Sequence, residues 1–161
     1  MFNKSSTFIL KLTVAVLGLI VLALAIFALP SAWKNGPLEF PGLDNIFHVI
    51  VVGMYATMIP FYYALWQTLK LLKYIDDNTA FSEMSVLALK KIKYSAILIS
   101  IFYMTGLPLL YPIAEMDDAP GLLLFGFVIA CAPIVVAVFA AVLHRLLRSA
   151  IEIKSENELT V

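Results

Sequence analysis

Charged side chains are scarce in this sequence: Asp, Glu, Lys and Arg together make up 14% of its 161 residues, whereas 62% are hydrophobic. A typical soluble domain is about half apolar and about a quarter charged. This composition excludes water as the main solvent of the chain. Eleven basic residues balance eleven acidic ones, so the net charge favours no direct nucleic-acid or polyanion partner.

Cysteine is nearly absent as well. The single thiol, Cys131, lies in an apolar run and cannot form an internal disulfide or a Cys-x-x-Cys redox pair. This lack excludes the quinone-linked four-helix enzymes that oxidise thiols.

Long hydrophobic runs, in contrast, dominate the chain. Four of them are long enough to cross about 30 Å of hydrocarbon, and they predict an all-α, polytopic membrane protein with one domain over residues 1–161. We expect spans at about 8–29, 46–69, 94–113 and 121–143. A cleaved signal peptide is the alternative for the first run, but that run exceeds the usual length of about 7–15 residues and lacks an Ala-x-Ala site. Prolines and glycines between 30 and 42 predict a short loop after it.

The segment between the second and third spans carries a signal for a helix start. Ser82 can cap the helix, Glu83 then falls in the first turn, and Phe81 and Val86 occupy the two positions of a hydrophobic staple. Three lysines follow before the third span, at 90, 91 and 93. We therefore expect a short interfacial helix in this loop, running into the third span with its lysines near the lipid phosphates.

The basic residues predict the orientation. Ten of the eleven Lys and Arg residues fall on one side of the predicted spans, and only Lys34 falls on the other. Because basic loops stay in the cytoplasm, both termini are predicted to be cytoplasmic. The expected location is the cytoplasmic (inner) membrane of a bacterium, with the lipid bilayer around the spans. The opposite side is acidic, with Glu39, Asp44, Glu115, Asp117 and Asp118.

Residues that perform chemistry do not gather in the sequence. His48 and His144 are predicted near opposite faces of a hydrocarbon layer about 30 Å thick, so they cannot share a haem. The acidic turns lack the spacing of a divalent-cation site, so a solvated turn is the favoured interpretation. No nucleophile–base set is visible. We therefore expect no enzymatic activity, no catalytic residue, no bound metal and no cofactor.

Transport is the alternative within the membrane. A transporter usually retains an ionisable residue in its spans, and these spans have none. Ala137 and Ala141 permit a close helix approach, which fits internal packing or the seam of a homo-oligomer. A small transporter, channel subunit or toxin-immunity protein stays open as an alternative, with a water-filled polar cavity as its mark. The polar side chains within the spans, which are typical of hydrogen bonds between helices, are Thr57, Gln67, Ser95, Ser100 and Thr105.

Two segments outside the spans are distinctive. The first is Leu72-Lys73-Tyr74-Ile75-Asp76-Asp77-Asn78-Thr79-Ala80-Phe81-Ser82, and the second runs from Ala150 to Val161 and contains Glu156-Asn157-Glu158-Leu159-Thr160. With the four spans, they resemble a bacterial family of small four-helix membrane proteins known as a domain of unknown function. The resemblance implies no catalytic residues. It does imply a cytoplasmic partner, because members are often encoded beside a small helix-turn-helix transcriptional regulator.

Both distinctive segments are predicted to face the cytoplasm, whereas the spans are generic Leu, Val, Ile and Ala. We therefore interpret the chain as a regulatory or accessory membrane protein whose loop and tail together form a docking surface. Seven residues are expected to carry this surface: Asp76, Asp77, Phe81, Ser82, Glu156, Asn157 and Leu159.

Overall fold

The computed structural model describes residues 4–159, and helices make up nearly all of them. Four helical segments are long and apolar enough to cross a membrane, namely Ser6–Glu39, Asp44–Asp76, Glu83–Met116 and Gly121–Leu159. The prediction of a multi-pass, all-α membrane protein is thereby confirmed. In chain order the elements are α1 (Lys4–Ala23), the π-helical turn η1 (Leu24–Ala28), α2 (Leu29–Glu39), α3 (Asp44–Asp76), α4 (Glu83–Gly106), the 3₁₀ turn η2 (Leu107–Leu109), α5 (Leu110–Met116) and α6 (Gly121–Leu159).

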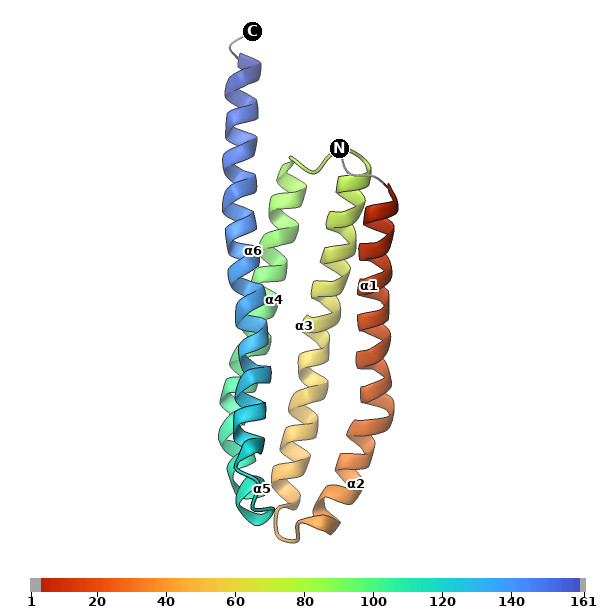
Figure 1. Ribbon diagram of the computed structural model, residues 1–161, viewed down its shortest axis with the longest axis vertical. Helices are drawn as coiled ribbons and strands as arrows, with labels where there is room; N and C mark the ends of the chain where they lie inside the picture. Colours follow the sequence, from red (N-terminus) through yellow and green to blue (C-terminus); the bar gives the residue numbers. More distant parts are fainter. Residues whose placement is uncertain (1–3, 160–161) are drawn as a thin grey trace.

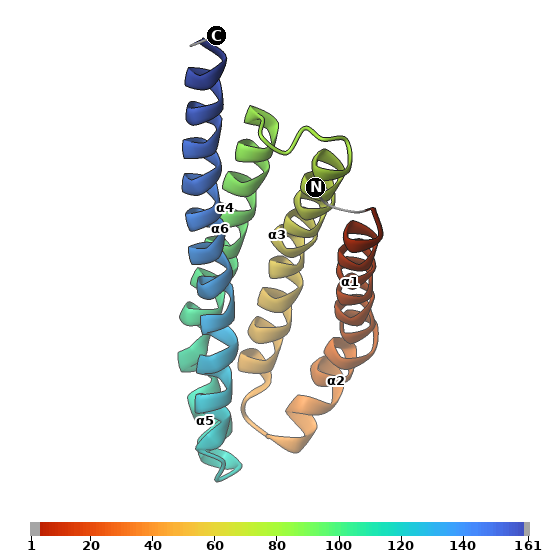
Figure 2. The ribbon, with the colours of Figure 1, turned by 45° about the horizontal axis from the view of Figure 1, so that its top comes forward.

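The long helices stand in a row in the order α1, α3, α4, α6 (Figures 1 and 2). The pairs α4–α6 and α3–α4 pack most extensively, α1 packs less closely on α3, and the described parts of α1 and α6 share no extensive contact. The result is a single layer of helices. Large apolar side chains such as Phe27, Ile59 and Phe139 are exposed on it. Lipid tails, which are as apolar as these side chains, can cover both faces of such a layer.

The first helical segment corrects the sequence prediction, because it continues past Pro30 and ends only at Glu39. The π-helical turn explains why. In this turn the Leu29 N–H bonds to the carbonyl of Leu24, five residues back, and the next residue is a proline without an N–H. The Ala25 carbonyl instead accepts a hydrogen bond of 2.7 Å from the Tyr55 hydroxyl of α3. The predicted loop at 30–42 therefore shrinks to the turn at 40–43.

Side-chain hydroxyls also bond to backbone carbonyls of neighbouring helices elsewhere in the layer. The Tyr62 hydroxyl of α3 donates to the carbonyl of Gly18 in α1 at 2.7 Å. Gly18 permits this approach, since a Cβ there would lie 3.3 Å from Leu65 Cδ1. Ser100 of α4 donates to the Ala130 carbonyl of α6 at 3.2 Å. In lipid such bonds replace the water that is missing around polar groups.

Small residues form the contact face of α6. Ala130, Ala137 and Ala140 are buried against the rest of the layer, and Ala130 is completely inaccessible. The spacing of Ala137 and Ala141 was compatible with internal packing or with the seam of a homo-oligomer. Ala137 serves internal packing. Ala141 is only partly buried.

The helix start at Ser82 is confirmed, but a separate interfacial helix is not found. The Ser82 side chain accepts a hydrogen bond from the Ser85 N–H, and α4 begins at Glu83. From there α4 continues without a break through the lysines and into the predicted third span. The turns that were predicted to form an interfacial helix are therefore the first turns of α4 itself.

Candidate functional site

One end of the molecule combines both chain ends with the loop between α3 and α4 (Figure 1). We call it the basic end, because α3 and α4 carry Lys70, Lys73, Lys90, Lys91 and Lys93 close to it. The opposite end holds the turns at 40–43 and 117–120, which adjoin the acidic residues Glu39, Asp44, Glu115, Asp117 and Asp118. The structure thus places the predicted docking segments at a common, basic end.

The loop at the basic end has a fixed backbone. It begins with a helix C-cap in which Asn78 adopts a left-handed conformation, with φ of 61°. The Asn78 N–H bonds to the Ile75 carbonyl at 3.2 Å, and the Thr79 N–H bonds to the Tyr74 carbonyl at 2.8 Å. This pair of bonds is a Schellman motif, and asparagine tolerates the left-handed position better than most residues.

Ser82 closes the loop on its other side. Its hydroxyl donates to the Thr79 carbonyl at 2.7 Å and accepts from the Ser85 N–H at 3.4 Å. Phe81 is held between these anchors, and 57% of its surface is exposed. Asp77, at the end of α3, is exposed as well. The loop therefore presents an aromatic side chain to its surroundings from a rigid frame.

Asp76 has an intramolecular role. Its carboxylate accepts a hydrogen bond from the buried Thr7 hydroxyl and forms an ion pair with Lys11 at 2.6 Å. The side chain is only 19% exposed. Asp76 therefore fastens the end of α3 to the beginning of α1, and it is a poor contact for a partner.

An ion pair also connects the loop region to α6. The Arg148 guanidinium lies 2.9 and 3.1 Å from the two carboxylate oxygens of Glu83, the first residue of α4. Both side chains are substantially exposed, so the pair contributes at most about 1 kcal/mol. It nevertheless fixes the level at which α6 passes the loop.

Beyond Arg148, α6 continues alone. Its last eleven residues, 149–159, extend about 16 Å further at 1.5 Å per residue, and Figures 1 and 2 show no other element beside them. We call this segment the α6 tail. Glu156, Asn157 and Leu159 lie near its tip, where Leu159 is 84% exposed. The structure therefore places these three residues beyond the level of Phe81 and Ser82, and a docking surface formed by loop and tail together stays a prediction.

Sequence reasoning missed the pattern of the tail. Leu146, Ala150, Ile153 and Asn157 follow one another at intervals of four, three and four residues, the spacing that places side chains on one stripe of a helix. Leu146 and Ile153 are more than 60% exposed. The signal was present in the sequence as Leu146, Ala150 and Ile153, three apolar residues that continue past the end of the predicted fourth span at helical spacing. We call these three residues and Asn157 the tail stripe.

The polar side chains within the layer do not form a cavity. Thr57 and Gln67 are buried, and the Thr57 hydroxyl donates to the Met54 carbonyl at 2.8 Å and lies 3.3 Å from the Tyr103 hydroxyl. Thr105, which was predicted to bond between helices, is exposed. Two grooves flank α4, and both are lined almost entirely by apolar atoms. Over residues 4–159, no three His, Cys, Asp or Glu side chains gather as metal ligands.

Comparisons with known proteins agree with this architecture. A family model described as "Protein of unknown function (DUF2975)" matches residues 6–161, a range that includes both segments of the resemblance. The uncharacterized membrane protein YoaS of Bacillus subtilis (strain 168) is 52% identical over 159 residues, which cover 99% of both chains. No solved structure matches the chain.

Proposed function

We propose that this chain, which belongs to the DUF2975 family of membrane proteins of unknown function, is a non-enzymatic accessory protein that docks a cytoplasmic helical partner on its α6 tail. The orientation assumed here, with both termini in the cytoplasm, rests on the distribution of lysine and arginine. Multi-pass insertion in the membrane anchors the tail at a fixed distance from the bilayer.

The isolation of the tail is the observation that carries this proposal. The tail propagates from the long helix α6, and its eleven residues have no neighbouring element to bury their apolar side chains. It also carries exposed Ile153 on a regular stripe. Binding of a second helix would bury this apolar surface and stabilise the tail, as in other helix-in-groove complexes.

Phe81 supplies a second contact at the base of the tail. It lies two residues before Glu83, whose carboxylate contacts Arg148 of α6. The tail stripe lies on the other side of α6 from Arg148, because Leu146 is about 160° around the helix from it at 3.6 residues per turn. Phe81 would therefore contact a different part of the partner from the stripe. Asp77, exposed in the same turn, is available for a polar contact at the rim.

The chemistry of the partner follows from the tail. Within the tail, Lys154 stands against Glu152, Glu156 and Glu158, so the net charge of −2 fits a partner with basic residues at the rim of the contact. The stripe itself fits the apolar face of an amphipathic helix. A small helix-turn-helix regulator, the partner that the family resemblance implies, consists of such helices.

Affinity purification of the tagged protein in mild detergent, followed by mass spectrometry, tests the proposal. Ile153→Lys adds a charge to the tail stripe and should remove a helical cytoplasmic protein from the eluate, as should Phe81→Ala combined with deletion of residues 156–161. Ser155→Lys adds the same charge off the stripe and should leave recovery unchanged. Equal recovery with Ile153→Lys, or capture of nothing but a second copy of this chain, would contradict a docking role for a separate partner.

A further inference from the structure

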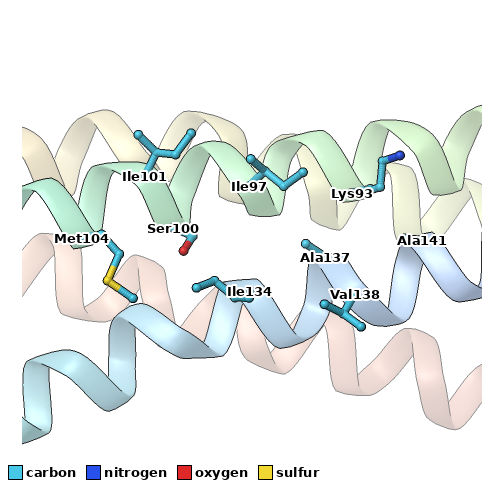
Figure 3. A pocket seen from close by; sticks show the side chains of 9 residues that line it. All are labelled: Lys93, Ile97, Ser100, Ile101, Met104, Ile134, Ala137, Val138 and Ala141. Carbon is cyan, nitrogen blue, oxygen red and sulfur yellow. The ribbon is translucent and has the colours of Figure 1, made fainter.

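An apolar groove of about 390 Å³ runs along the layer between α4 and α6 (Figure 3). Ile97 and Met104 of α4 line it together with Ile134, Val138 and Ala141 of α6. The hydroxyl of Ser100, which also faces it, already donates to the Ala130 carbonyl. Apart from Lys93 at one end, the groove therefore has no polar group that requires a polar ligand, and its length fits a hydrocarbon chain.

The groove has the length of one lipid leaflet. From Lys93 at one end to Met104 at the other, α4 rises about 16 Å, which is about half of the 30 Å hydrocarbon core. Lys93 marks the headgroup level, since its ammonium lies 4.9 Å from the ring centroid of Tyr94, and lysine and tyrosine both favour the membrane interface. A chain in the groove would thus place its headgroup beside Lys93.

Cationic groups surround this end of the groove. Lys90, Lys93 and Arg148 all lie within electrostatic range of His144 on α6. Glu83 neutralises Arg148, which leaves the charges of Lys90 and Lys93 to face an incoming group. Burial and the neighbouring cations lower the pKa of His144, so its imidazole is a neutral hydrogen-bond donor there. Two lysines and a neutral histidine that can donate a hydrogen bond, at the mouth of an apolar groove, match the phosphate and the acyl chain of one molecule.

We propose that the groove between α4 and α6 is a binding site for an anionic phospholipid, with one acyl chain along Ile97 and Val138 and the phosphate at Lys93, Lys90 and His144. The inference goes beyond the docking role of the tail and does not depend on it. The second groove, of about 400 Å³ between α3 and α4, provides an internal comparison because its single lysine, Lys91, neighbours Lys93 in the sequence.

The charge of the site is tested by native mass spectrometry of the full-length protein, titrated in detergent with phosphatidylglycerol or phosphatidylcholine. We expect phosphatidylglycerol to bind more tightly, and Lys93→Gln to weaken it about fivefold, the effect of one lysine at a membrane surface. Lys91→Gln should change binding less than twofold. No preference between the two lipids, or equal losses in both variants, would overturn the proposal.

The acyl chain is tested by filling the groove. Ala141→Phe places a ring in it and should abolish tight binding of phosphatidylglycerol, whereas Ala132→Phe, on an exposed part of α6, should not. Circular dichroism confirms that both variants remain helical. Glycerol 3-phosphate, which has the headgroup phosphate without a chain, should not displace the lipid at equal concentration. Displacement by glycerol 3-phosphate, or tight binding to Ala141→Phe, would contradict a lipid site in this groove.

Discussion

At the scale of single residues, hydroxyl groups compensate for what lipid cannot provide. Pro30 removes one N–H from the first helical segment, and the Tyr55 hydroxyl donates to the Ala25 carbonyl that this leaves without a helical donor. Tyr62 makes a bond of equal length to Gly18, but Gly18 lies within the regular helix α1. The hydroxyls of Tyr55 and Tyr62 should therefore contribute unequally to the free energy of unfolding.

This difference predicts unequal costs for two matched substitutions. Tyr55→Phe should lower the free energy of unfolding by about 1–2 kcal/mol, because it leaves a buried carbonyl unsatisfied. Tyr62→Phe should cost about 0.6 kcal/mol, a typical value for a hydrogen bond between membrane helices. Reversible unfolding in mixed detergent micelles measures both values. Equal costs would show that the Ala25 carbonyl does not depend on Tyr55.

At the scale of elements, the helix ends show which features local sequence determines. Ser82 was identifiable as a cap because the required residues lie within one turn of it. The end of the first helical segment could not be identified in the same way. Proline and glycine normally stop a helix, and Tyr55, which bonds to the carbonyl left free near Pro30, lies on α3. Local signals thus predicted the start of α4 correctly. The first helical segment is longer than local signals predicted, because a contact with another helix stabilises it.

The Ser82 cap gives a local prediction. Ser82→Ala should cost about 1 kcal/mol at the start of α4, and amide hydrogen exchange of residues 79–86 should accelerate. Ser82→Asp retains a capping oxygen and should restore protection, while Ser149→Ala, on the exposed face of α6, should have no effect on this loop. Faster exchange throughout α4 would instead indicate that Ser82 stabilises more than the loop.

At the scale of the whole molecule, the sequence predicted the four spans, the membrane location and the family. It could not predict that the helices form a row, because generic apolar spans do not specify which helix packs on which. Nor could it show that Asp76 pairs with Lys11, since 65 residues separate them. Nor could the sequence show how far the tail extends past the loop, because that length depends on where the neighbouring helices end.

The row also leaves α6 at an edge, and only at the basic end does this helix pass beyond its neighbours (Figure 1). The docking role of this tail is the central claim. Photocrosslinking in living cells tests it most directly, with a photoreactive amino acid placed at Ile153 on the tail stripe or at Ser155 off it. If the tail docks a partner, a covalent adduct with a helical cytoplasmic protein forms at 153 and little or none at 155. Adducts of equal yield at both positions, or none at 153, would contradict the docking role.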